Sequence, residues 1–163
     1  MLVPHEPKHL LALVESERAF ERASGITLAS GLRDFLLAGS DEFMKKLRAA
    51  TKPDPWHFGF GVVHKIDNCM IGFASFTAPP DSDCAVEIAY GIAPSYWGKG
   101  CATEAARALI NYAINDGRVR TIRAHTLAQT NASTRVLEKC GFKKVSKVVD
   151  SENNLVWRWE TNI

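Results

Sequence analysis

The sequence predicts an α+β fold in one domain, with helices on both faces of a central sheet that is mixed but mostly antiparallel. Three features of the 163 residues predict it. Apolar residues have helical spacing in the first third of the chain and alternate at the strand period from residue 56 onward. A long amphipathic helix then stands between two strands, and a hairpin closes the chain. A chain of this length is expected to bury about 70% of its unfolded surface as one domain.

The composition is that of an ordinary globular protein, with 46% hydrophobic residues, 23% charged residues and a net charge of +2. This small charge argues against a nucleic-acid partner, and no apolar run reaches the ~18 residues of a membrane span. The first residues lack the pattern of a signal peptide. The cysteines have neither C-x-x-C nor zinc-finger spacing, so we expect reduced thiols in the cytoplasm and no metal site: Cys69, Cys84, Cys101 and Cys140.

The first third is predicted to be mostly helical and to cover one end of the core. It is expected to hold a short edge strand ended by Pro4, a helix over 9–20, a helix ended near Gly39, and a helix over 41–50 capped by Ser40. From Trp56 three strands with tight turns predict an antiparallel meander, over 56–64, 70–77 and 84–92.

The clearest helix covers 100–115, and strand 119–127 follows it. A strand, a helix and a strand of these lengths predict a right-handed crossover and a parallel strand pair. A further helix begins at a cap, Asn131 or Thr130, and ends at Gly141. Two last strands, over 143–150 and 154–160, form the closing hairpin.

A glycine pair, Gly98-Lys-Gly100, lies between strand 84–92 and helix 100–115. A dinucleotide fingerprint is excluded because Thr103 occupies its third glycine position, and the P-loop pattern is absent. Two interpretations remain open on this stretch alone. One is a pyrophosphate cradle at the helix N-terminus, and the other is an ordinary tight turn.

A second motif, Ala132-Ser-Thr-Arg-Val-Leu-Glu-Lys-Cys-Gly-Phe142, follows about thirty residues later. Together with Trp97-Gly-Lys-Gly-Cys-Ala-Thr-Glu-Ala105, it resembles the GNAT acetyltransferase superfamily, most closely the branch of the ribosomal-protein N-terminal acetyltransferases. The resemblance covers roughly residues 56–160. It implies an acetyl-CoA-binding core over 56–160, a helical substrate-side cover over 1–55, and a split between the two parallel central strands.

The resemblance also implies where acetyl-CoA binds. Pantetheine would pair with the strand edge near Ile92, backbone N–H groups of the glycine loop would hold the pyrophosphate, and Ser133 would lie near the thiol. The residues carried over as cofactor-binding are Ile92, Trp97, Gly98, Lys99, Gly100, Cys101, Ala102, Thr103, Asn131 and Ser133. The chain departs from the family at Leu137, where many members have a tyrosine general acid.

Glu87 is the candidate general base. Strand alternation places it on a sheet face with Ala89 and Gly91, where a carboxylate is costly to bury without a task or a partner. The alternative is a structural ion pair, for instance with Arg123. The histidines of the predicted strands are interpreted as sheet residues, and His57 is the one most worth testing.

The expected function is acetyl transfer to a primary amine, of a peptide N-terminus or a small molecule, by direct attack in a ternary complex. Glu87 removes the amine proton, an N–H group around Ala89–Gly91 polarises the thioester carbonyl, and Ser133 donates to the thiolate. The alternative is an acyl-CoA-binding module with little or no activity, which the missing tyrosine favours. We expect no nucleic-acid or membrane partner and leave a homodimer open.

Overall fold

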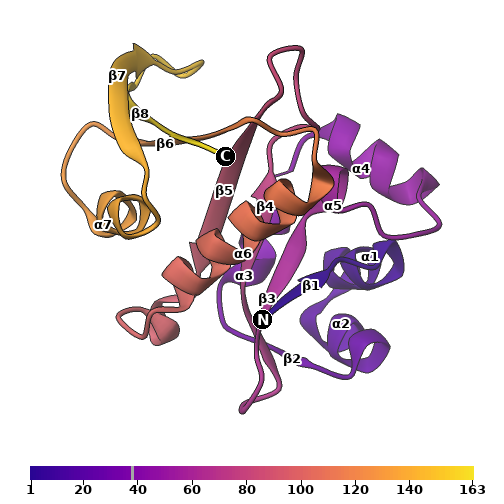
Figure 1. Ribbon diagram of the computed structural model, residues 1–163. Coiled ribbons are helices and arrows are strands. Elements are labelled where there is room, and N and C mark those ends of the chain that lie inside the picture. The colour runs from indigo at the N-terminus through magenta and orange to yellow at the C-terminus, as the bar shows by residue number, and fades with distance from the viewer. Residues whose placement is uncertain (38) are drawn as a thin grey trace.

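The computed structural model describes residues 1–37 and 39–163 and contains a mixed eight-stranded sheet (Figure 1). The strand order is β1-β3-β4-β5-β6-β8-β7, and β2 pairs with β4. The strands are β1 Leu2–Pro4, β2 Thr27–Leu28, β3 Phe60–His64, β4 Cys69–Phe76, β5 Ala85–Ile92, β6 Thr121–Leu127, β7 Lys143–Val149 and β8 Leu155–Asn162.

Seven α-helices and one 3-10 turn are assigned in the described residues. They are α1 Pro7–Glu15, α2 Glu17–Ser24, α3 Leu32–Leu37, α4 Asp41–Ala49, α5 Pro55–Phe58, η1 Pro94–Tyr96, α6 Cys101–Asp116 and α7 Ala132–Lys139. The end of the helix that was predicted to stop near Gly39 includes residue 38, which lies outside the described residues. None of the described helices has the length and hydropathy needed to cross a bilayer.

The central strands β5 and β6 are parallel and separate after a short ladder. They pair from Ala85↔Thr121 to Glu87↔Arg123 and no further, although β5 continues to Ile92. Every other long strand pair in the described sheet is antiparallel. The predicted fold class, with its split between two parallel strands, is therefore confirmed.

Helices cover both faces of the sheet, as predicted. Figure 1 shows α6 crossing one face, where Leu109 packs with Val86 and Ile122 in the main core. Met70 belongs to a second buried cluster with Leu10 of α1 and Leu47 of α4. This second cluster is separate from the main core, and α1, α2 and α4 contribute its buried helical residues.

The prediction of a strand over 56–64 is wrong at its start. Residues 55–58 form the one-turn helix α5 instead, because Asp54 accepts a hydrogen bond from the Trp56 N–H at 3.1 Å and Pro55 occupies the first helical position. Gly59 then turns the chain into β3 with a φ of +65°. His57 therefore lies on a helix rather than a strand, 2.8 Å from the Asp54 carboxylate.

The predicted helix over 9–20 is two helices. Ser16 ends α1 and caps α2, since its hydroxyl accepts a hydrogen bond from the Ala19 N–H at 3.0 Å. Of the two candidate caps of α7, the structure uses Asn131, which forms a capping box with Thr134. The edge strand, the second and third strands of the meander, the helix between the two parallel strands and the closing hairpin are found close to where they were predicted.

Candidate active site

Most of the residues predicted to bind the cofactor line one open cleft of about 870 Å³ beside the end of β5. Eight of the ten line it: Ile92, Trp97, Gly98, Gly100, Cys101, Ala102, Thr103 and Ser133. Lys99 and Asn131 are not lining residues. The Lys99 ammonium lies 4.7 Å from the centre of the Tyr96 ring, and the Asn131 side chain accepts the Thr134 N–H that it caps.

The N-terminus of α6 opens into this cleft without a side-chain cap. Its N-cap is Gly100, at a φ of +83°, and the first helical hydrogen bond there runs from the Glu104 N–H to the Gly100 carbonyl. The three preceding N–H groups, of residues 101–103, have no acceptor in the described part of the chain. In contrast, α2, α4, α5 and α7 each begin with a capping side chain. Free N–H groups and the helix dipole make this an anion-binding terminus.

Two cations of α7, Arg135 and Lys139, line the same cleft and were not predicted. They are four residues apart on a helix, so they share one face. The sequence signal was available, because this spacing occurs in the same motif as Ser133. The cleft therefore carries positive charge on the α7 side as well as open N–H groups on the α6 side.

The indole of Trp97 covers the edge of β5. Its Nε1–H donates a hydrogen bond of 2.6 Å to the Ile92 carbonyl, while 67% of the residue stays exposed. This is the strand edge that was expected to pair with pantetheine. Trp97 therefore holds the Ile92 carbonyl in the structure described here, and other backbone groups of β5 remain for a ligand.

The backbone of β5 exposes polar groups to the split. The Thr77 N–H donates to the Glu87 carbonyl at 2.9 Å, and the Ala93 N–H donates to the Ile71 carbonyl at 2.8 Å. Odd-numbered residues of β5 thus direct their backbone groups at β4. Because these directions alternate along a strand, Tyr90 directs its N–H and carbonyl into the split, beyond the last residue pair with β6.

A second cavity, of about 410 Å³, lies against the same stretch of β5. It shares four lining residues with the cleft, which are Leu32, Phe35, Tyr90 and Gly91. Gly91 has no Cβ, and one added there would meet nothing within 4 Å. The two cavities therefore adjoin along these four residues, and at Gly91 the missing side chain leaves space between them.

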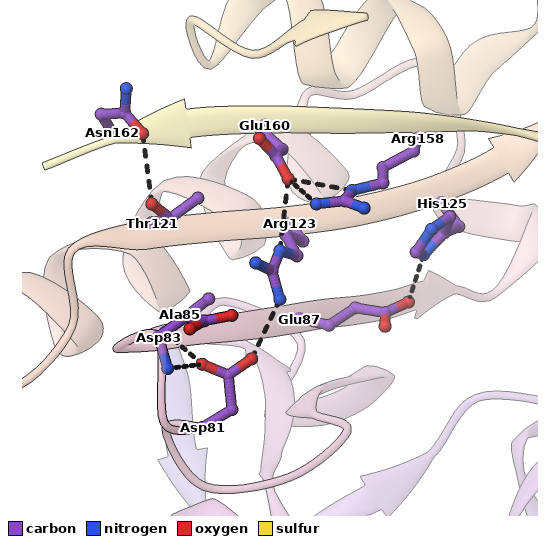
Figure 2. A network of polar contacts seen from close by, with 10 residues as sticks. All are labelled: Asp81, Asp83, Ala85, Glu87, Thr121, Arg123, His125, Arg158, Glu160 and Asn162. Carbon is purple, nitrogen blue, oxygen red and sulfur yellow. Dashed lines mark hydrogen bonds and ion pairs between the residues drawn. The ribbon is translucent and has the colours of Figure 1, made fainter. Parts of the chain in front are cut away.

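Glu87 pairs with His125, not with Arg123 (Figure 2). His125 Nδ1 lies 2.7 Å from Glu87 Oε1, and the two side chains are 30% and 34% exposed. The guanidinium of Arg123 instead bridges Asp81 at 2.9 Å and Glu160 at 3.2 Å. The suggested ion pair of Glu87 with Arg123 is thus not formed. Neither Glu87 nor His125 lines either cavity, but Glu87 lies two residues before Ala89, which does.

Hydrogen bonds hold the surrounding carboxylates in their charged form. The Ala85 N–H bonded to Asp81 lowers the pKa of that carboxyl, and Arg123 contributes further. Glu160 has a lowered pKa because Arg158, its first hydrogen-bond partner, and then Arg123 stabilise the carboxylate. Asp81 and Glu160 are therefore already paired with arginine side chains of β6 and β8.

Of the hydroxyl-bearing residues that line the cleft, Ser133 and Tyr90 are the candidates for a proton donor. Ser133 lies exposed in the first turn of α7, as predicted, whereas Leu137 is buried at 1% exposure in the core. Tyr90, which sequence reasoning missed, lines both cavities. Burial raises the pKa of its phenol, so the hydroxyl keeps its proton at neutral pH.

His5 is a second functional candidate that the sequence did not indicate. It lines the smaller cavity at 6% exposure, and its Nε2 has no hydrogen-bond partner in the described residues. Burial, reinforced by nearby His9, lowers the pKa of the imidazole to about 4. The ring is therefore neutral at physiological pH.

Comparisons with known proteins show to which sequences the chain is similar. The sequence model of a family described as acetyltransferase (GNAT) domain matches residues 1–143, which include the helical first third. The probable N-acetyltransferase YjcK of Bacillus subtilis (strain 168) is 32% identical over 104 residues, or 63% of this chain and 55% of that protein. The uncharacterized N-acetyltransferase p20 of Bacillus licheniformis is 28% identical over 93 residues, or 57% of this chain and 52% of that protein. The chain spans about half the length of the curated relatives it matches.

Solved structures share the fold along the whole chain. A GNAT-family acetyltransferase from Streptococcus pneumoniae superposes with a TM-score of 0.68 at 18% identity, covering 100% of this chain and 98% of that one. A spermidine N-acetyltransferase SpeG K23-Q34 chimera from Vibrio cholerae and hSSAT has a TM-score of 0.65 at 19% identity, covering 99% and 95%. At these identities the likeness concerns the fold alone.

Proposed function

Because the chain belongs to the GNAT acetyltransferase family, we propose that it transfers an acetyl group from acetyl-CoA to a primary amine by direct attack in a ternary complex. One observation carries the proposal: two cavities of different chemistry meet at Gly91. The larger one suits a phosphate-bearing cofactor and the smaller one an acceptor. A ligand in each would bring donor and acceptor together without an acyl-enzyme.

The cleft fits acetyl-CoA in both size and chemistry. Its volume of about 870 Å³ is in the range of cofactor sites. The free N–H groups of Cys101, Ala102 and Thr103 would hold the pyrophosphate, and a Cβ on Gly100 would enter open space in the cleft. Arg135 would add a cation on the opposite wall. When bound, acetyl-CoA supplies an activated thioester.

Tyr90 contributes the oxyanion donor in this proposal. Its backbone N–H faces the split and lies within the stretch 89–91 that was expected to supply such a donor. A fixed N–H group that points to a developing negative charge stabilises it without reorganisation. The antiparallel pairing of β4 with β5 on the other side keeps this N–H in place.

The pair of Glu87 and His125 acts on the amine proton. Glu87 Oε1 fixes His125 through Nδ1, which leaves Nε2 free to accept a proton. Glu87 and Ala89 point to the same sheet face about 7 Å apart along β5, so His125 or a water molecule links the pair to the amine. Glu87 keeps the general-base role predicted for it, with His125 as the added partner.

Ser133 donates a proton or a hydrogen bond to the departing thiolate. Its hydroxyl lines the cleft and makes no described hydrogen bond to the protein. Tyr90 lines the same cleft and keeps its phenol protonated, so it is a second candidate donor for this step. Either one would replace the tyrosine that many family members have at the position of Leu137.

Finer features of the proposal follow the sequence resemblance. The ribosomal-protein branch favours a peptide N-terminus as one source of the amine. The four free thiols suit the reducing cytoplasm. A homodimer remains a prediction that light scattering tests.

Thiol release from acetyl-CoA, measured with a panel of amines and peptides, tests the proposal. We expect release that depends on both enzyme and amine, with initial rates that fit a sequential mechanism. If acetyl-CoA binds but no amine causes thiol release, the result would instead support the alternative of an acyl-CoA-binding module. A parallel-line pattern and a trapped acetyl-enzyme would contradict direct attack.

A further inference from the structure

We infer that the smaller cavity selects a primary amine carried on an apolar, preferably aromatic, group and rejects polyamines. The inference rests on the proposed function, because it names the acceptor class for the same site. A primary amine on an apolar group can come from two sources, a free arylalkylamine or a peptide whose first residue is large and apolar.

The walls of the cavity are aromatic and aliphatic. They come from α1, α3, α4, α5 and β4, and the main contributors are Leu10, Leu32, Phe35, Phe43, Phe58 and Phe73. The rings meet at an angle rather than in parallel stacks, with Phe43 and Phe58 at a centroid distance of 6.0 Å and an interplanar angle of 72°. Such walls bind a flat ring through dispersion and edge contacts. The volume of about 410 Å³ is small for a ligand site, so one ring system fits.

The two aliphatic hydroxyl groups of the cavity lie on its β4 wall. Ser75 is opposite Ala89, two residues before Gly91 on β5, and Thr77 is further along, opposite Glu87. A primary amine near Ser75 would have a hydroxyl partner and would lie on the Glu87 side of Gly91. Its apolar group would then extend toward α1 and α4. This division fixes the orientation of the acceptor.

The cavity offers no negative charge to a second ammonium group. Among the described lining residues there is no aspartate or glutamate, and the titratable groups are His5, His57 and Tyr90. His5 is neutral at physiological pH, since burial lowers its pKa to about 4. A polyamine would therefore bury an unpaired ammonium in apolar walls, which is strongly unfavourable.

The carboxylates outside the cavity do not supply the missing charge. Figure 2 shows Glu87 directed at His125, and Arg123 directed at both Asp81 and Glu160. Each of these carboxylates already has a basic partner. A polyamine would have to break one of these pairs to be recognised.

The test compares kcat/KM for four acceptors at one pH and saturating acetyl-CoA. They are tryptamine, a short peptide starting with Phe, a short peptide starting with Ser, and spermidine. We expect tryptamine or the Phe peptide to exceed spermidine by about 100-fold or more, since an unmatched buried polar group costs that much discrimination. The two preferred acceptors distinguish a free amine from a peptide N-terminus. Spermidine as the best acceptor, or a Ser peptide equal to the Phe peptide, would overturn the inference.

A charge placed in the cavity gives an independent check. Phe35 lines both cavities and is 70% exposed, so its replacement is compatible with folding. We expect Phe35→Glu to raise kcat/KM for spermidine about 10-fold relative to the neutral, equally long Phe35→Gln, since it supplies the missing counter-charge. Equal spermidine kinetics in the two variants would contradict the inference.

Binding measurements keep the inference separate from the proposed function. If no amine releases thiol, catalysis fails, and calorimetric titration of tryptamine and spermidine into the CoA-bound protein still decides selectivity. Tighter binding of tryptamine by about 100-fold supports the inference without turnover. Equal or tighter binding of spermidine contradicts it even if acetyl transfer is observed.

Discussion

The two cavities that meet at Gly91 are built in opposite ways. The cleft is formed mainly by two short stretches, 92–103 and 132–139, and presents N–H groups, glycines and cations. The acceptor cavity is formed by residues from 5 to 91 along the chain and presents aromatic rings. The cleft thus binds what every member of a cofactor-dependent family must bind, whereas the acceptor cavity can change its walls independently.

The substitution Gly100→Val should have the largest effect and break the cleft alone. A side chain at a φ of +83° is strained, and its atoms would enter the space beside the uncapped N–H groups. We expect acetyl-CoA affinity to fall by about 1000-fold or more, as judged by calorimetry. Amine binding should be retained.

Gly117→Val is the matched control for this substitution. Gly117 ends the same helix at a φ of +75°, also with nothing within 4 Å of an added Cβ, but it lies outside the cleft. Both variants should lose similar stability, about 1–2 kcal/mol. Only the Gly100 variant should lose the rise in Tm that acetyl-CoA gives, and an unchanged rise would show that the loop assignment is wrong.

The substitution Glu87→Gln should impair removal of the amine proton and leave both cavities intact. We expect kcat to fall about 100- to 1000-fold, with a shift of the acid limb of the pH profile, because His125 loses the carboxylate that holds it as proton acceptor. Affinity for acetyl-CoA should change less than 3-fold, as estimated from the position of Glu87 outside the cleft. Glu160→Gln, on the same open face, is the control and should keep the profile; a wild-type profile in the Glu87 variant would exclude Glu87 from the mechanism.

The buried His5 makes the stability of the chain depend on pH through a residue of the acceptor cavity. Its pKa is lowered from 6.5 to about 4 in the folded chain, so the unfolded chain binds more protons between these values. The contribution is fully present above pH 6.5 and is lost as the pH falls toward 4, by up to about 3 kcal/mol. His5→Phe should flatten the decline in urea-derived stability over this range, and an identical decline in both proteins would contradict the assignment.

The variants Ser133→Ala and Tyr90→Phe test which hydroxyl of the cleft protonates the leaving thiolate, and they should have the smallest effects. Loss of the hydroxyl that protonates the thiolate should lower kcat about 10-fold with little change in KM for acetyl-CoA. The rate should recover with acetyl donors whose leaving thiol is more acidic. If neither variant affects kcat, neither hydroxyl protonates the leaving group.

The same contrast explains what could be predicted from the sequence. The cleft was predictable because its groups are close in sequence: Gly100 must adopt a left-handed φ, and Ser133 follows a cap. The long periodic elements, α6 and the strands β4 and β5, were predictable for a similar local reason. Short elements were not, since the two residues of β2 depend on β4 and α5 depends on the Asp54 cap.

The acceptor cavity could not be predicted because its lining residues are far apart in the sequence. His5 and Phe73 are brought to a centroid distance of 5.5 Å by the pairing of β1 and β3 in the same sheet. The partner of Glu87 was equally hidden. His125 lies two residues beyond the last position at which β6 pairs with β5, and its contact with Glu87 depends on how these two strands separate.

The central claim is that acyl donor and amine meet at Gly91, and the variant Gly91→Val tests it most directly. Valine suits a strand, and the added side chain would enter the space that joins the cavities. With both ligands saturating, we predict that single-turnover acetyl transfer falls about 1000-fold while each ligand alone binds within about 3-fold of wild type. Transfer at the wild-type rate in a variant that binds both ligands would contradict the account.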